Sequence, residues 1–150
     1  MQQGRTTERA EGSRRRDARH EARARQTSVE TARLVQEATG LESPERALEA
    51  LEIVVGGVVR RITPTEANDF VWQLPGGLKD RWLDLRAGPD RNVTRETVAL
   101  ELARQLGFNV ERAEFVLRGV GLALTDLVSE GELEQVRNQV PEDFREVLWS

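Results

Sequence analysis

The feature that most constrains the fold of this chain is an internal repeat. A shift of 66 residues superimposes Glu45-Arg46-Ala47 on Glu111-Arg112-Ala113, and Gln73-Leu74-Pro75 on Gln139-Val140-Pro141. Most apolar positions between these motifs match at the same shift, and upstream a shift of 67 aligns Gly40 with Gly107. Because one repeated unit cannot bury its apolar face alone, the pattern predicts two similar units that share a core.

Each copy carries the signals of four helices. Hydroxyl residues mark the helix starts at Thr27, Ser43, Thr63 and Ser129. The spacing of Thr63 to Glu66 and of Ser129 to Glu132 predicts capping boxes, in which the glutamate reaches back to the backbone N–H of the cap residue. Gly40 and Gly107 suit the left-handed residue that ends the first helix of each copy.

The apolar run Ile53–Val59, taken alone, could also be a buried strand. Its repeat partner carries leucines and valine at helical spacing over 115–127, so we predict helices over about 44–61 and 110–127. Glycines inside a helix cost about 1 kcal/mol relative to alanine, so a compensation is needed. We expect close approach of the two central helices, with a hinge as the alternative, at Gly56, Gly57, Gly119 and Gly121.

The predicted fold class is all-α. Two tandem four-helix repeats, residues 27–86 and 93–150, are expected to pack in a pseudo-twofold bundle. They are joined by a loop near 86–93. A basic arm, residues 1–26, precedes them and is expected to be disordered, because after Met1 it has no apolar side chain larger than alanine.

The arm and the body carry opposite charge. The arm holds eight arginines and four acidic residues, a net charge of +4, whereas the remaining 124 residues have a net charge of −8. The arm is therefore either a solvated tail that folds back on the acidic body or a weak, sequence-tolerant nucleic-acid ligand. The candidate nucleic-acid contacts are Arg14, Arg15, Arg16, Arg19, Arg23 and Arg25.

The residue inventory offers little for catalysis. There is no cysteine, and His20, the single histidine, lies in the arm. Thiolate zinc sites and disulfides are thus excluded, and a Ser/His/Asp triad in the body is excluded too. We expect no enzyme activity, cofactor or metal site. Glu66 and Glu132 are the best-placed carboxylates, but capping explains them; an acid-based hydrolase would need buried, like-charged acids in a cleft.

The three tryptophans differ in their surroundings. Trp82 and Trp149 lie on or beside apolar stripes and are expected to be core anchors. Trp72 lies off the stripe of its helix, and its repeat counterpart is the polar Asn138. Trp72 is therefore our candidate partner-binding residue, with packing against the other repeat or the arm as the alternative.

The order of these motifs resembles a prokaryotic family of two-repeat helical proteins, catalogued as domain of unknown function twenty-two sixty-seven. Its pattern is a helix ending in glycine, a glutamate-arginine-alanine start, a capped helix ending in leucine-proline, and a tryptophan. The matching residues over 27–150 are Gly40, Glu45-Arg46-Ala47, Thr63, Leu74-Pro75 and Trp82, then Gly107, Glu111-Arg112-Ala113, Ser129, Val140-Pro141 and Trp149. The resemblance implies a helical fold and a bacterial or archaeal origin, but no agreed activity.

The sequence thus favours a non-enzymatic, cytoplasmic helical module that binds an unidentified protein. Nucleic-acid binding through the arm is the alternative. No membrane span is expected, because the longest apolar run is far shorter than the roughly 20 residues that cross a bilayer. The sequence does not determine the oligomeric state.

Overall fold

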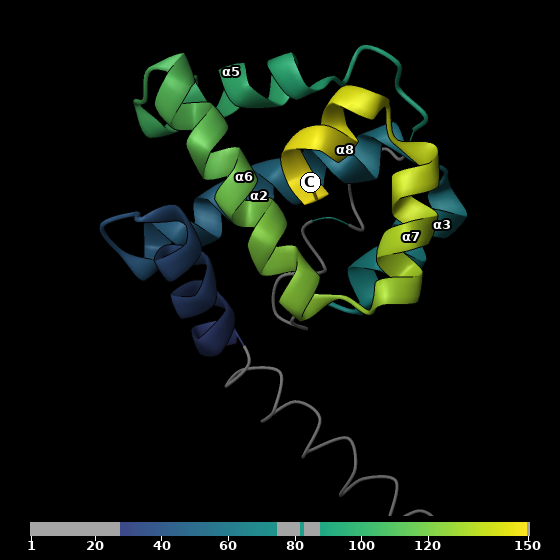
Figure 1. The fold of residues 1–150 in the computed structure, drawn as a ribbon, viewed down its shortest axis with the longest axis horizontal. Helices are drawn as coiled ribbons and strands as arrows, with labels where there is room; N and C mark the ends of the chain where they lie inside the picture. Colours follow the sequence, from purple (N-terminus) through teal and green to yellow (C-terminus); the bar gives the residue numbers. More distant parts are fainter. Residues whose placement is uncertain (1–27, 75–81, 83–87, 150) are drawn as a thin grey trace, which may run out of the picture.

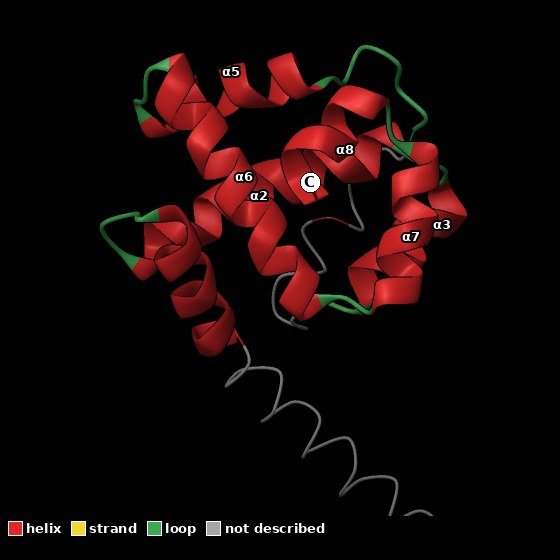
Figure 2. Ribbon diagram, in the orientation of Figure 1, coloured by secondary structure: helices red, strands yellow, loops and turns green. Residues whose placement is uncertain are grey.

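The structure is a computed structural model that describes residues 28–74, 82 and 88–149. Every regular element in this part of the chain is a helix (Figure 2), which confirms the all-α prediction. A first helix covers 28–39. The remaining helices are α2 (Pro44–Arg61), α3 (Pro64–Trp72), α5 (Arg95–Leu106), α6 (Val110–Leu127), α7 (Glu130–Gln139) and α8 (Glu142–Trp149).

The two long helices, α2 and α6, are 18 residues each and contact one another near the centre of the molecule (Figure 1). Their bounds match the predicted ranges, so the strand alternative for 53–59 is wrong. Both helices present apolar side chains to a single core, since α2 also packs on α5, and α6 on α5 and α8. The largest fully buried side chains include Phe70, Phe144 and Leu51.

The helix ends follow the predicted chemistry. Gly40 and Gly107 have φ values of 72° and 74°, the left-handed conformation that ends a helix and that glycine adopts without strain. Ser43 Oγ accepts a hydrogen bond from the backbone N–H of Arg46 at the start of α2. Asn109 does the same for Arg112 at the start of α6. The two long helices therefore begin with equivalent caps at repeat-related positions.

Two glycines, one in each long helix, do allow a neighbouring helix to approach closely, but the neighbour is not the one predicted. A Cβ added to Gly57 would lie 2.6 Å from Val98 Cγ2 on α5, and one on Gly119 would lie 2.5 Å from the carbonyl oxygen of Ala38. The neighbours are thus α5 and the helix at 28–39, and not the other long helix. The expectation that these glycines bring α2 and α6 together was wrong at both positions.

Trp82 is 2% exposed and donates from Nε1 to the backbone oxygen of Glu52, so its predicted role as a core anchor is confirmed. The side chain of Trp149 lies outside the described residues, as do the arm and most of the segment between α3 and α5. The fourth helix predicted for the first repeat falls mostly in this segment and so lies outside the described residues. In the part that is described, no helix is long and apolar enough to cross a membrane.

Candidate functional site

The short helices α3 and α7 lie side by side at one end of the molecule (Figure 1). They follow α2 and α6 and occupy repeat-related positions. Thr63 Oγ1 accepts from the backbone N–H of Glu66, and Ser129 Oγ accepts from that of Glu132. Each hydroxyl thus caps its helix, as the sequence predicts.

The second half of the predicted capping boxes is wrong. The backbone N–H of Thr63 donates to Gln139 Oε1 at 2.9 Å, and that of Ser129 donates to Gln73 Oε1 at 2.7 Å. Each cap residue is therefore bonded to a glutamine at the end of the opposite helix, and not to the glutamate three residues later. These two reciprocal bonds tie the start of each helix to the end of the other.

Glu66 and Glu132, the two glutamates that do not complete the predicted capping boxes, are buried. Glu66 is 8% exposed and Glu132 is 9% exposed, and their carboxyl groups are close enough to interact. With its amide nitrogen toward the pair, Gln135 donates to Glu66 Oε2 at 3.2 Å and to Oε1 at 3.3 Å. Glu132 Oε1 is buried without a hydrogen-bond partner. The α3–α7 interface therefore encloses two acidic groups, one of which is only partly satisfied.

Burial raises the pKa of Glu132 from its ordinary value of 4.5 to about 8. The hydrogen bond to Glu66 and the negative charges of Glu66 and Asp69 act in the same direction. All of these effects favour the neutral form of the Glu132 carboxyl. Its charged form would be poorly solvated at this buried position and repelled by the neighbouring acidic groups. Glu132 therefore holds a proton at neutral pH.

Trp72 is the last residue of α3, and its side chain is exposed to solvent. Its side chain is 57% exposed, and its indole Nε1 donates to Asn68 Oδ1 at 3.2 Å, one helical turn earlier. The next residue is Gln73, whose side chain is bonded to α7. The expectation that Trp72 lies off the core is confirmed, and its ring is held at the end of a helix that is tied to its neighbour.

A second cluster of repeat-related residues lies at the other ends of α2 and α6. Arg46 and Arg112 both lie over the ring of Phe108, with guanidinium carbons 5.5 Å and 4.8 Å from its centroid. Both also reach Glu42, at 3.5 Å and 3.7 Å. The arginines of the repeated tripeptide thus stabilise the contact between the starts of α2 and α6, and this contact accounts for the motif structurally.

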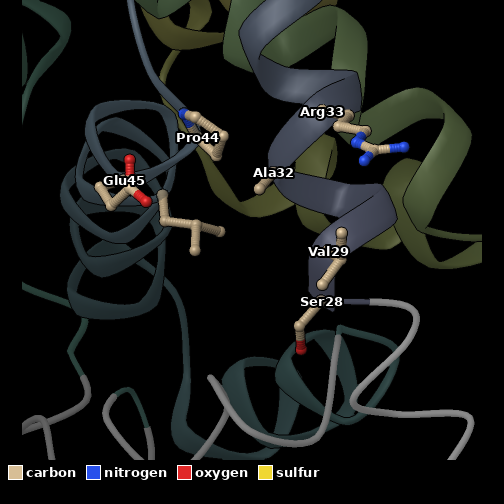
Figure 3. Close-up of a pocket in the computed structure, with 7 residues that line it drawn as sticks. Ser28, Val29, Ala32, Arg33, Pro44 and Glu45 are labelled. Atoms are coloured by element: carbon tan, nitrogen blue, oxygen red, sulfur yellow. The ribbon is translucent and has the colours of Figure 1, made fainter.

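An apolar crevice separates the helix at 28–39 from the start of α2 (Figure 3). Its volume is about 360 Å³, and its lining residues are Ser28, Val29, Ala32, Arg33, Pro44, Glu45 and Leu48. At the repeat-related place, Arg95 and Glu114 stand where the first copy has Ser28 and Leu48, and they form a 3.3 Å ion pair between α5 and α6. The two copies therefore differ at this surface.

The arginines proposed for nucleic-acid contact, from Arg14 to Arg25, lie outside the described residues. In the described part of the chain, no group of three or more histidine, cysteine, aspartate or glutamate side chains is arranged to hold a metal ion. The roles of Gln73, Gln139 and Gln135 were missed, although the recurrence of a glutamine two residues before proline was a visible signal for the first two.

Comparison with known proteins agrees with the resemblance found in the motifs. No curated protein matches the chain. Residues 29–147 match a family described as Uncharacterized conserved protein (DUF2267). The match spans both copies of the repeat, so the chain belongs to the DUF2267 family.

Proposed function

We propose that this protein is a non-enzymatic helical module that binds another protein through the surface around Trp72. Its scaffold in this proposal is a pair of tandem four-helix repeats in a pseudo-twofold bundle. The observation that carries the proposal is the exposure of the Trp72 ring while its indole N–H is already bonded to Asn68. A large aromatic ring held in solvent can bind a partner with little further loss of conformational entropy.

The contrast with the repeat-related residue supports this interpretation. Asn138 occupies the same place on α7 and is also exposed. The site therefore tolerates a polar side chain in one copy, and the fold does not require tryptophan there. Residues that a fold does not need and that leave an aromatic surface in water are typical of binding sites.

The acid-based hydrolase remains a less favoured alternative. Glu66 and Glu132 supply the buried, like-charged acids that it requires. However, both oxygens of Glu66 accept from Gln135, and Glu132 is bonded to Glu66, so the two groups are engaged with the helix interface. This arrangement supports a structural or regulatory role for the pair.

A photo-crosslinking amino acid at position 72 tests the proposal in cells of origin, with the same probe at 138 as the matched control. We expect a discrete heavier adduct from position 72 and none from 138. A third probe at Leu122, which is 60% exposed on α6, tests a rival apolar surface. An adduct from 122 and none from 72 would show that the Trp72 assignment is wrong.

Nucleic-acid binding through the arm is the second candidate, because the arm carries a net charge of +4 next to a body of −8. Fluorescence anisotropy with random single- and double-stranded oligonucleotides tests it. Full-length protein should be compared with a variant in which the six candidate arginines are glutamine. Binding that falls with salt and is lost in the variant would support this function; no binding by either would exclude it.

A further inference from the structure

The buried acids at the α3–α7 interface have no positive partner on these two helices. The sequence of α3 contains no arginine or lysine, and Arg137, the single basic residue of α7, bonds to Glu130 at 3.1 Å. At the end of the preceding α2, Arg60 is paired with Glu101 at 3.3 Å. The additional charge that acts on Glu132 is the carboxylate of Asp69. The interface therefore concentrates negative charge as soon as both glutamates are ionised.

The two buried carboxyl groups are neighbours, and a hydrogen bond between them requires a proton. Two carboxylates are acceptors only, so a bond between them exists only when one carries a hydrogen. With its amide nitrogen toward the pair, Gln135 donates to both oxygens of Glu66, so both of these oxygens act as acceptors. Glu132 is then the protonated member, and it is more than nine-tenths buried with one oxygen unpartnered.

We propose that Glu66 and Glu132 share one proton and form a proton-dependent lock between α3 and α7. The interface is tight while the proton is bound. When it is lost, two adjacent carboxylates repel one another in a poorly hydrated position, and α3 and α7 separate locally. The reciprocal bonds of Gln73 and Gln139 connect the same two helices, so they loosen together with the acidic pair.

The direction of the pH effect follows from linkage. In the opened interface Glu132 has its ordinary pKa near 4.5, and in the closed interface its pKa is about 8. Between these values the closed form binds more protons than the open form, so the closed form weakens as pH rises. The lock is fully closed below the lower value, loosens through neutral pH, and reaches a plateau above about pH 8.

Amide hydrogen exchange of the full-length protein from pH 5 to 9, corrected for intrinsic exchange rates, tests the lock. For α3 and α7 we expect the opening equilibrium constant to rise by up to about tenfold per pH unit and then to level off. In Glu132→Gln, where an amide replaces the protonated carboxyl, this constant should stay within about twofold over the same range. Glu134→Gln, an exposed acid on the same helix, should behave as the wild type.

A wild-type opening constant that does not change with pH, or the same slope in Glu132→Gln, would overturn the proposal. If Glu132→Gln fails to fold, a carbon-13 NMR titration of the Glu132 carboxyl in the wild-type protein decides the question. A midpoint near 8 supports the lock, and a midpoint near 4.5 overturns it. The lock does not depend on the proposed role of Trp72, because neither measurement involves a partner.

Discussion

Replacement of Gly119 by alanine tests how the first described helix is held against α6. Gly119 lies inside α6 and is buried. A Cβ at this position would lie 2.5 Å from the carbonyl oxygen of Ala38, 2.9 Å from Thr39 Cγ2 and 3.0 Å from the carbonyl carbon of Ala38. Two of these three neighbours are backbone atoms, which cannot move away by a side-chain rotation. The added methyl group must therefore push the helix at 28–39 away from α6.

Two opposing effects set the magnitude. Alanine is favoured over glycine inside a helix by about 1 kcal/mol. Overpacking a tight contact typically costs 1–3 kcal/mol, and a clash with backbone belongs at the upper end, at about 3 kcal/mol. We therefore expect Gly119→Ala to lower the free energy of unfolding by about 2 kcal/mol.

Urea unfolding followed by far-UV circular dichroism measures this change. Gly131→Ala is the matched control: Gly131 lies in the first turn of α7, and a Cβ there meets no atom within 4 Å. It should stabilise the protein by about 0.5 kcal/mol, because only the helix propensity acts. If Gly119→Ala is neutral or stabilising while Gly131→Ala behaves as expected, the close contact between α6 and Ala38 is refuted.

Four further substitutions test the α3–α7 junction, the exposed tryptophan and the core. Gln139→Ala and Gln73→Ala should each lower the free energy of unfolding in urea by about 1 kcal/mol, since each leaves one backbone N–H without its partner. Equal changes in the free energy of unfolding would show that the two bonds contribute equally to the junction. No change from either substitution would contradict the reciprocal bonds. Trp72→Ala should lower the free energy of unfolding by less than about 1 kcal/mol, because the ring is mostly exposed. The midpoint of thermal unfolding should therefore change little. A loss of several kcal/mol would remove the basis of the binding proposal. Phe70→Ala should cost about 3–5 kcal/mol, since Phe70 is fully buried, and an effect below about 1 kcal/mol would place it outside the core.

The local features of the fold could be predicted from the sequence. The bounds of α2 and α6, the caps at Ser43 and Ser129, and the left-handed glycine at 107 all follow from residues within a few positions of the feature. The first four N–H groups and the last four C=O groups of a helix have no partner within the helix. Only a few residue types at the helix ends can bond to them. The internal repeat resolved the ambiguous segment 53–59, because its repeat partner has apolar residues at helical spacing.

The candidate site could not be predicted in the same way. The spacing of Thr63 and Glu66 is that of a capping box, and an isolated helix would form one. In the folded protein Gln139 arrives from a helix 76 residues away and takes the cap N–H, and Glu66 turns into the interface instead. The choice depends on the approach of α7, which no local pattern contains. The same holds for Gly119, whose neighbour Ala38 lies on a distant part of the chain.

The comparison of the two copies separates residues that maintain the fold from residues free to acquire a function. Both copies keep the same residue type where repeat-related residues bridge the copies: Glu66 lies beside Glu132, Gln73 bonds to Ser129, and Gln139 bonds to Thr63. A change in one copy would leave the other without its partner, so such positions resist divergence. At one exposed position the copies have diverged: Trp72 faces solvent where the second copy has Asn138. The shared acidic pair therefore indicates a property of the scaffold itself, its response to a proton. The unshared tryptophan is the residue through which we propose that this chain binds a partner, and the two properties can be tested one at a time.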